Sequence, residues 1–339
     1  RCRCNPATPT ARSWRRPAAR SSIPCHTDPK RRACGPPGFA RYKRRVAGTK
    51  TPGGILVRKL QFEYPDDLRA HWHPARPEWS QMVNAASLLM PYLEPYLIDA
   101  IRAALPAITD PALREEARGY MGQEAHHYKQ HRRFNELLVA RGYDGIRGYE
   151  RTLAADYARF AHGRPLAFQL AYAAGFETMA LAIGHMLIRM RTFFFAQADP
   201  AVTSLVLWHF VEELEHKHAA FEVYQHVVGR WGMRVYGLGF AMVHTLGRTR
   251  RAYVMLLRHD GLWGRWRTRL RVKLLLARIF GYMLPWIVEA LSPWHQPRRF
   301  RDPAWAREWI RLYDDGAPDL IHLDTRQMHR SPAAMVAAC

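Results

Sequence analysis

The chain has 339 residues, of which 48% are hydrophobic, and a formal net charge of +22. A chain of this length and hydrophobic content can form one large domain with a substantial core. Much of the charge lies in residues 1–52, which hold 14 Lys or Arg against the single acid Asp28, a local +13. The five cysteines lie only at positions 2, 4, 25, 34 and 339, which excludes a thiol nucleophile, a zinc–thiolate site or a disulfide framework within the body and favours a reducing, cytoplasmic compartment.

Residues 1–52 are rich in Arg, Pro and Ser and show no apolar periodicity, so we expect a disordered basic tail. An upstream extension produced by a misplaced start is favoured over a targeting peptide. Nucleic-acid binding is not expected, because only Trp14, Phe39 and Tyr42 could stack on bases within this tail.

Helical periods dominate the body of the chain, and the alternation typical of strands is scarce, so we predict an all-α fold. A short extended lead-in is expected over residues 55–64. Residues 53–230 form the predicted bundle, with Asp110 and Asp199 as caps directly before Pro111 and Pro200. The expected helices lie at about 80–105, with a kink at Pro91, and at about 111–141, 149–161, 166–196 and 200–228.

Residues 231–313 are predicted to form additional helices packed on the bundle, and residues 314–339 a loose tail. The longest uncharged run, between Arg234 and Arg248, has 13 residues, fewer than the roughly 20 needed to span a bilayer, so no transmembrane helix is expected. Residues 248–278 hold ten Lys or Arg against Asp260 alone. A solvated basic face covering the bundle is favoured here, and peripheral contact with anionic lipid is the alternative.

Four helices carry acids or histidines on otherwise apolar faces. His209, Glu213 and His216 occupy positions i, i+4 and i+7 and share one helix face. The Glu-x-x-His spacing recurs at Glu124 and His127. Single acids, Glu94 and Glu177, lie within the apolar faces of the first and third bundle helices.

In chain order the pattern is Glu, Glu-x-x-His, Glu, Glu-x-x-His, which is that of ferritin-like dinuclear carboxylate bundles. The acids of each helix pair are 30 and 36 residues apart, which suits similar depths in antiparallel helices. Four carboxylates would also neutralise two divalent ions. We therefore predict an all-α, ferritin-like four-helix bundle with a dinuclear metal site and additional C-terminal helices.

Other polar residues near these positions are expected to support the site. Glu215 and His218 also show the Glu-x-x-His spacing, but His209 selects the register of Glu213. Glu212 and Glu215 are then outer-shell partners or surface charges. His131 and His185 are expected to orient ligands or line the cavity.

At these motifs the chain resembles a bacterial family of predicted metal-dependent hydrolases. The resemblance covers about residues 55–313 and is carried by residues 91–98, Gly122-Gln123-Glu124-Ala125-His126-His127, and Trp208-His209-Phe210-Val211-Glu212-Glu213-Leu214-Glu215-His216-Lys217. Where the family has Phe-Pro-x-Gly-Glu, this chain has Met90-Pro91-Tyr92-Leu93-Glu94.

The same set of residues is similar to that of p-aminobenzoate N-oxygenase-type di-iron enzymes. This similarity implies seven metal ligands: Glu94, Glu124, His127, Glu177, His209, Glu213 and His216.

Carboxylate and imidazole ligands without thiolates suit two iron ions, with manganese or zinc as alternatives. We expect a di-iron oxygenase or oxidase that acts on a small organic substrate with O2 and an electron donor. The alternative is a metal-dependent hydrolase that uses a metal-activated water.

Overall fold

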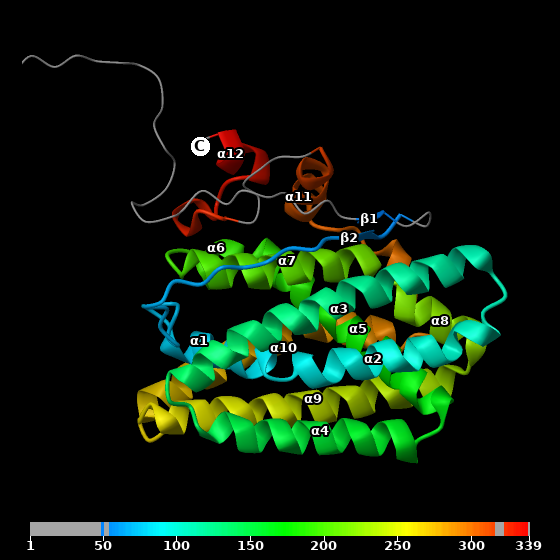
Figure 1. Cartoon of the computed structure of the whole chain (residues 1–339), viewed down its shortest axis with the longest axis horizontal. Helices are drawn as coiled ribbons and strands as arrows, with labels where there is room; N and C mark the ends of the chain where they lie inside the picture. The colour runs from blue at the N-terminus through cyan, green and yellow to red at the C-terminus, as the bar shows by residue number, and fades with distance from the viewer. Residues whose placement is uncertain (1–48, 51–53, 316–321, 338–339) are drawn as a thin grey trace, which may run out of the picture. The chain divides into compact units, whose positions relative to one another are not determined.

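The computed structural model describes residues 49–50, 54–315 and 322–337 (Figure 1). Within these residues the fold is all-α, apart from two strands of two residues each that pair antiparallel, β1 (Thr49–Lys50) and β2 (Leu56–Val57). Apart from β1, the expected basic tail lies outside the described residues. The α-helices are α1 (Pro77–Ser87), α2 (Met90–Ala104), α3 (Pro111–Ala140), α4 (Gly145–Gly163), α5 (Leu166–Arg189), α6 (Arg191–Phe195), α7 (Pro200–His216), α8 (Ala219–Val227), α9 (Trp231–His259), α10 (Trp266–Ala290), α11 (Ala304–Asp314) and α12 (Pro332–Ala337).

The centre of the fold is formed by α2, α3, α5 and the successive helices α7 and α8, which pack on one another (Figure 1). Two of these helices begin as predicted. The Asp110 carboxylate accepts a hydrogen bond from the Ala112 N–H, and that of Asp199 accepts from Ala201 and Val202, in each case with proline next in the chain. In the described part of the chain, three short 3₁₀ helices, η1 (Leu105–Ala107), η2 (Pro297–Arg299) and η3 (Thr325–Gln327), lie between the α-helices.

Three of the expected bundle helices are each divided in two. The helix predicted over 80–105 is α1 followed by α2, and Pro91 lies in the first turn of α2 rather than at a kink within a continuous helix. Proline has no N–H to donate and its ring crowds the preceding turn, so a helix starts there more readily than it continues. The helix predicted over 166–196 divides at Met190 into α5 and α6. The helix predicted over 200–228 divides after His216 into α7 and α8.

Helix α5 lies in the interior and packs most extensively on α9. The two backbones meet at glycines: a Cβ atom added at Gly237 would lie 2.3 Å from the Ala171 carbonyl oxygen, and one at Gly175 would lie 2.6 Å from the Leu238 Cα. Such contact is possible only without side chains at these positions.

By length and composition alone α5 could also cross a membrane. However, 72% of its most apolar 18-residue stretch is buried inside the protein. Helix α5 does not form a long uncharged run, because Glu177 interrupts its apolar sequence. This degree of burial is typical of a core helix.

The C-terminal segment, expected to be loose after residue 314, is partly folded in the described region. Residues 322–337 contain η3 and α12, and Leu323 and Met328 are buried. The Thr325 hydroxyl donates to the Ala198 carbonyl, and the Gln197 N–H donates to the carbonyl of Thr325. Buried apolar side chains and backbone hydrogen bonds offset the entropy cost of ordering these residues.

Candidate metal centre

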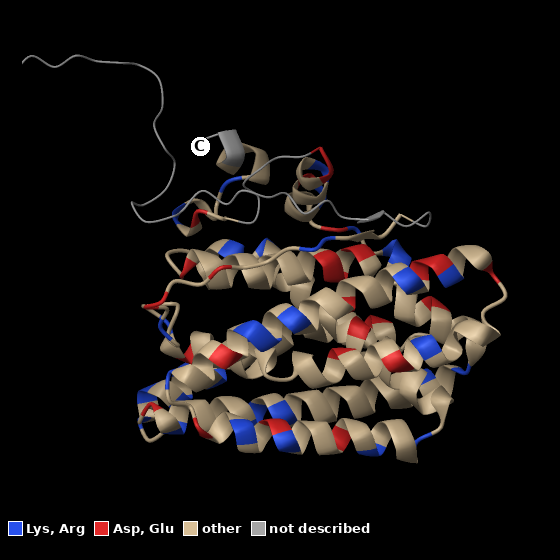
Figure 2. Ribbon diagram, viewed as in Figure 1, with Lys and Arg blue, Asp and Glu red and all other residues tan. Residues whose placement is uncertain are grey.

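The seven predicted ligand residues lie together in the interior of the bundle. They form two groups in which one nitrogen or oxygen atom from each residue lies within 4.8 Å of the others. The first group is Glu94, His127 and His209, and the second is Glu124, Glu177, Glu213 and His216. Figure 2 shows acidic positions on the helices that face one another in the middle of the bundle. All seven side chains are buried, although ionised acids are rarely found in cores without partners.

Helix α7 places three of these residues on one face, as the spacing predicts. Glu213 lies between the two histidines: its Oε1 is 3.0 Å from His209 Nε2 and its Oε2 is 3.1 Å from His216 Nε2. The competing register is not directed at this centre, because Glu215 contacts Arg58 and His218 contacts Glu116. Glu213 thus connects the two groups of side chains.

The other helices bring their residues to the same place. His216 Nε2 lies 3.1 Å from Glu124 Oε1 of α3 and 3.5 Å from Glu177 Oε2 of α5. His127 Nδ1 faces Glu213 Oε1 at 3.7 Å, and its ring stacks on that of His209 with centroids 4.2 Å apart. Four separate helices therefore supply the side chains of this centre.

The buried carboxyl groups repel one another. Burial, followed by the negative charges of Glu124 and Glu213, raises the pKa of Glu94 well above its ordinary value. Burial and the charge of Glu213 do the same to the pKa of Glu177. Burial opposes the charged form of His216, but Glu213 and the neighbouring carboxylates outweigh it and raise the pKa of this histidine. The cluster therefore favours bound positive charge, either protons or metal ions.

The three imidazoles are held by partners on their outward nitrogens. His216 Nδ1 donates to Gln123 Oε1 at 2.9 Å, and Gln123 is fixed in turn because its Nε2 donates to the Leu56 carbonyl and to Glu215. His127 Nε2 donates to Glu212 Oε2 at 3.0 Å. When neutral, both rings therefore present an unprotonated nitrogen, Nε2 of His216 and Nδ1 of His127, to the centre.

His209 is oriented by a longer chain of hydrogen bonds. The Ser87 hydroxyl donates to Asn135 Oδ1 at 2.7 Å and therefore accepts from His131 Nδ1 at 2.8 Å. His131 Nε2 then accepts from His209 Nδ1 at 2.9 Å, which leaves His209 Nε2 unprotonated and directed at Glu213. Burial and the neighbouring His209 lower the pKa of His131, which keeps this connecting ring neutral.

The donor set fits two metal ions. Both oxygens of Glu94 and of Glu124, together with Glu177 Oε2 and His127 Nδ1, are buried without a hydrogen bond of acceptable geometry. Unpaired carboxylate oxygens and imidazole nitrogens are costly in a core but suitable as ligands for Fe, Mn or Zn. Four carboxylates balance the charge of two divalent ions.

Sequence reasoning missed Arg58, a fully buried arginine that follows β2. Its Nη1 lies 3.1 Å from Glu212 Oε1 and 2.6 Å from Glu215 Oε2. The signal was present in the lead-in, where Leu56, Arg58, Leu60 and Phe62 alternate with more exposed residues and so share the inner face. Arg58 compensates the two outer acids, and Glu212 in turn contacts His127.

Two further residues differ in their relation to the centre. The Tyr120 hydroxyl donates to Glu177 Oε1 at 2.9 Å, so this tyrosine belongs to the site. His185, in contrast, has its described contacts with Tyr282 and Trp286 of α10. His185 is eight residues from Glu177, a rise of about 12 Å along α5, and at that level it lies beside α10 rather than at the cluster.

Comparisons with known proteins identify the family. Residues 56–300 match the family described as predicted metal-dependent hydrolases, and this range includes all seven clustered side chains. Neither the curated proteins nor the solved structures give a match. The chain therefore belongs to the family of predicted metal-dependent hydrolases.

Proposed function

We propose that this protein is an enzyme whose buried centre holds two metal ions through Glu94, Glu124, His127, Glu177, His209, Glu213 and His216. The observation that carries the proposal is the convergence of these side chains into two adjacent groups. In the same proposal the bundle is of the ferritin-like type, for which this ligand pattern is characteristic.

Each group would hold one ion, and Glu213 would contribute to both. Its two oxygens face different histidines, His209 on one side and His216 on the other. Glu213 would therefore supply a carboxylate oxygen to each ion, and the ions would supply Lewis acidity or redox chemistry. Fe is the proposed metal, with Mn or Zn as alternatives, because these ions accept mixed carboxylate and imidazole ligands.

Hydrolysis is the reaction that family membership supports. Bound divalent ions would supply Lewis acidity and lower the pKa of a water molecule. The chain's own contribution would be to keep the three histidines unprotonated toward the centre, to hold the Glu177 carboxylate through Tyr120, and to exclude bulk water by burial. The substrate would be a small organic ester, amide or phosphate.

Oxidation with O2 is the second candidate, and the composition of the donor set favours it. Four carboxylates against three imidazoles reduce the net charge of the centre, which weakens a Lewis acid but stabilises more oxidised metal ions. Two ferrous ions would supply electrons to O2, and a separate electron donor would restore them. Tyr120, held by Glu177, is the nearest phenol that the described contacts place at the centre.

One pair of assays separates the two reactions. The metal-free protein is loaded without oxygen either with Fe(II) or with Zn(II), and O2 uptake and ester or phosphoester cleavage are measured for each form. Zn-dependent cleavage without O2 uptake by the Fe(II) form supports hydrolysis, whereas stoichiometric O2 uptake with an optical change supports oxidation. Glu124→Ala should abolish the observed reaction, and Glu115→Ala on the same helix, which pairs at the surface with Arg118, should retain it.

A further inference from the structure

The apolar surface of this protein is concentrated on one pair of helices. Among the described residues, the strongly exposed large apolar side chains all lie between Trp231 and Trp294, on α9, on α10 or just after it. Large exposed apolar side chains that gather on one pair of helices often mark a contact surface.

Helix α10 carries most of these side chains, and they recur at helical spacing along its outer face. Trp266 is 63% exposed, Leu274 and Leu284 are each 61% exposed and Val288 is 59% exposed. The opposite face is packed on the protein through Thr268, Val272, Met283 and Ala290. The helix has 25 residues, so the outward stripe is about 37 Å long.

Cations flank the stripe. Helix α10 has five exposed cationic residues and a single acid, Glu289. The cations are Arg267, Arg269, Arg271, Lys273 and Arg278. Arg267 and Arg271 fall on one side of the stripe, and Arg269 and Lys273 fall on the other. A helix with an outward apolar stripe between two rows of cations has the character of one that lies on an anionic membrane.

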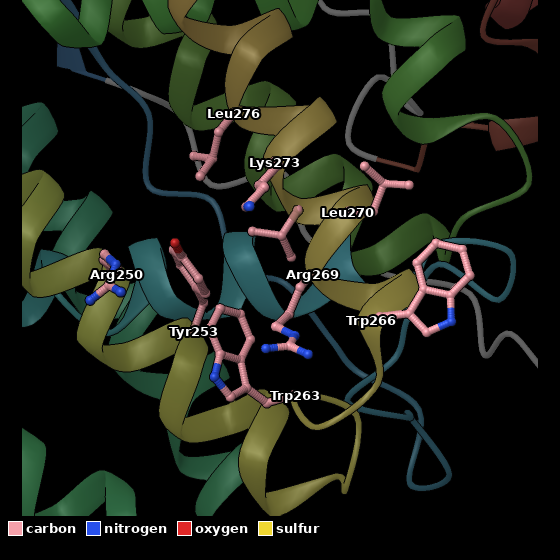
Figure 3. A pocket seen from close by; sticks show the side chains of 9 residues that line it. Arg250, Tyr253, Trp263, Trp266, Arg269, Leu270, Lys273 and Leu276 are labelled. Carbon is pink, nitrogen blue, oxygen red and sulfur yellow. The ribbon is translucent and has the colours of Figure 1, made fainter.

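A cationic cavity of about 500 Å³ lies beside the stripe, between α9 and the first half of α10. Figure 3 shows Arg269 and Lys273 reaching from α10 toward the rings of Tyr253 and Trp263, with Arg250 on α9 nearby. Among the described ion pairs, none involves Arg250, Arg269 or Lys273. Unpaired cations around an aromatic-walled hollow are suited to a phosphate headgroup.

From these observations we propose that the outer face of α10 and the adjacent cavity bind the surface of a lipid bilayer that contains anionic phospholipids. The apolar stripe would enter the interfacial region, with Trp266 and Trp294 near its two ends, and the flanking cations would contact headgroups. A second copy of the chain is a poorer occupant, because pairing this face with itself would oppose five cations on each copy against one acid.

Co-flotation of the full chain with vesicles tests the proposal. The vesicles are phosphatidylcholine alone or phosphatidylcholine with roughly 30% phosphatidylglycerol, at about 0.1 M salt. The wild-type chain should partition onto the anionic vesicles, and Leu274→Glu/Leu284→Glu should lower the partition coefficient by roughly tenfold or more. Arg269→Glu/Lys273→Glu should do the same, while binding to neutral vesicles stays weak for all variants.

The matched control is Arg102→Glu/Arg151→Glu, which makes the same change in charge on exposed positions of α2 and α4. It should bind nearly as well as wild type, and every variant keeps the basic residues 1–52. Circular dichroism and thermal melting establish that each variant is folded, as expected for exposed positions. The proposal is overturned if the control loses as much binding as the Arg269→Glu/Lys273→Glu variant, if the leucine variant binds normally, or if sedimentation shows a dimer that the leucine variant dissociates.

Discussion

His216 Nδ1 and Gln123 Oε1 lie 2.9 Å apart, and this contact determines which nitrogen of the imidazole is available to a metal ion. Gln123 cannot turn its amide around without losing its donor bonds to the Leu56 carbonyl and to Glu215. The backbone of β2 therefore orients His216, a proposed metal ligand, through the side chain of Gln123.

Replacing Gln123 should weaken metal binding. Gln123→Leu removes the acceptor for His216, and we expect affinity for the divalent ion to fall about 10- to 100-fold. Competition with a chromophoric chelator measures this change. Gln130→Leu is the control, because Gln130 ties α3 to the Leu60 carbonyl without contacting a clustered histidine; an equal loss of affinity in both variants would contradict the orienting role of Gln123.

Arg58 should contribute strongly to stability. Arg58→Met leaves Glu212 and Glu215 without their buried partner, so we expect the free energy of unfolding to fall by about 3 kcal/mol or more. Urea denaturation measures the loss. Adding Glu212→Gln and Glu215→Gln to Arg58→Met should restore part of it, whereas additive effects of the three substitutions would show that these charges are not coupled. Arg118→Met, at an exposed pair with Glu115, should change stability by less than about 0.5 kcal/mol.

The contact between α5 and α9 should be sensitive to a single methyl group. Gly237→Ala places a Cβ atom against the Ala171 carbonyl, and we expect about 1–3 kcal/mol of destabilisation. Gly239→Ala lies on the same helix with nothing within 4 Å of the added atom, so higher helix propensity should leave stability unchanged or slightly improved. Thermal denaturation measures the melting temperature of each variant. Equal melting temperatures would show that α5 and α9 can move apart without a loss of stability.

Asp260 should make part of the stability dependent on pH. Burial raises the pKa of its carboxyl, but hydrogen bonds from His71, Tyr143 and Gln81 outweigh burial and lower it. Because the pKa is lower in the folded state than in the unfolded state, the stabilisation is present above the unfolded value near 3.9 and is lost as pH falls through the folded value.

The comparison is urea unfolding of wild type and Asp260→Asn over a range of pH. The variant should be less stable by about 1–2 kcal/mol near neutral pH, and the difference should shrink in acid. A difference that grows as the pH falls would contradict this assignment.

The site was more predictable from sequence than the path of the chain around it. Periodicity identifies Glu94, Glu124, Glu177 and Glu213, because an ionised acid on an apolar helix face is costly unless a cation neutralises it. The prediction that these residues bind metal is tested only by experiment. The Asp-Pro starts of α3 and α7 were also readable, since cap and proline act within one turn.

Other features depend on contacts between distant segments. Arg58 and Glu215 are 157 residues apart, so no local pattern reveals their pairing. The division between α7 and α8 has no proline or glycine to mark it, and it falls at Lys217, whose ammonium donates to the carbonyl of the distant Phe300. The contacts of His185 also depend on a distant segment. Its sequence position gives its distance from Glu177 along α5, but its neighbours on α10 determine what it contacts.

The central claim is that seven side chains from four helices hold a pair of metal ions. Anomalous diffraction from crystals of the metal-loaded protein tests it most directly. The account predicts two strong peaks, one bounded by Glu94, His127 and His209, the other by Glu124, Glu177 and His216, with Glu213 between them. A single peak, or peaks away from these residues in a fully loaded protein, would contradict it.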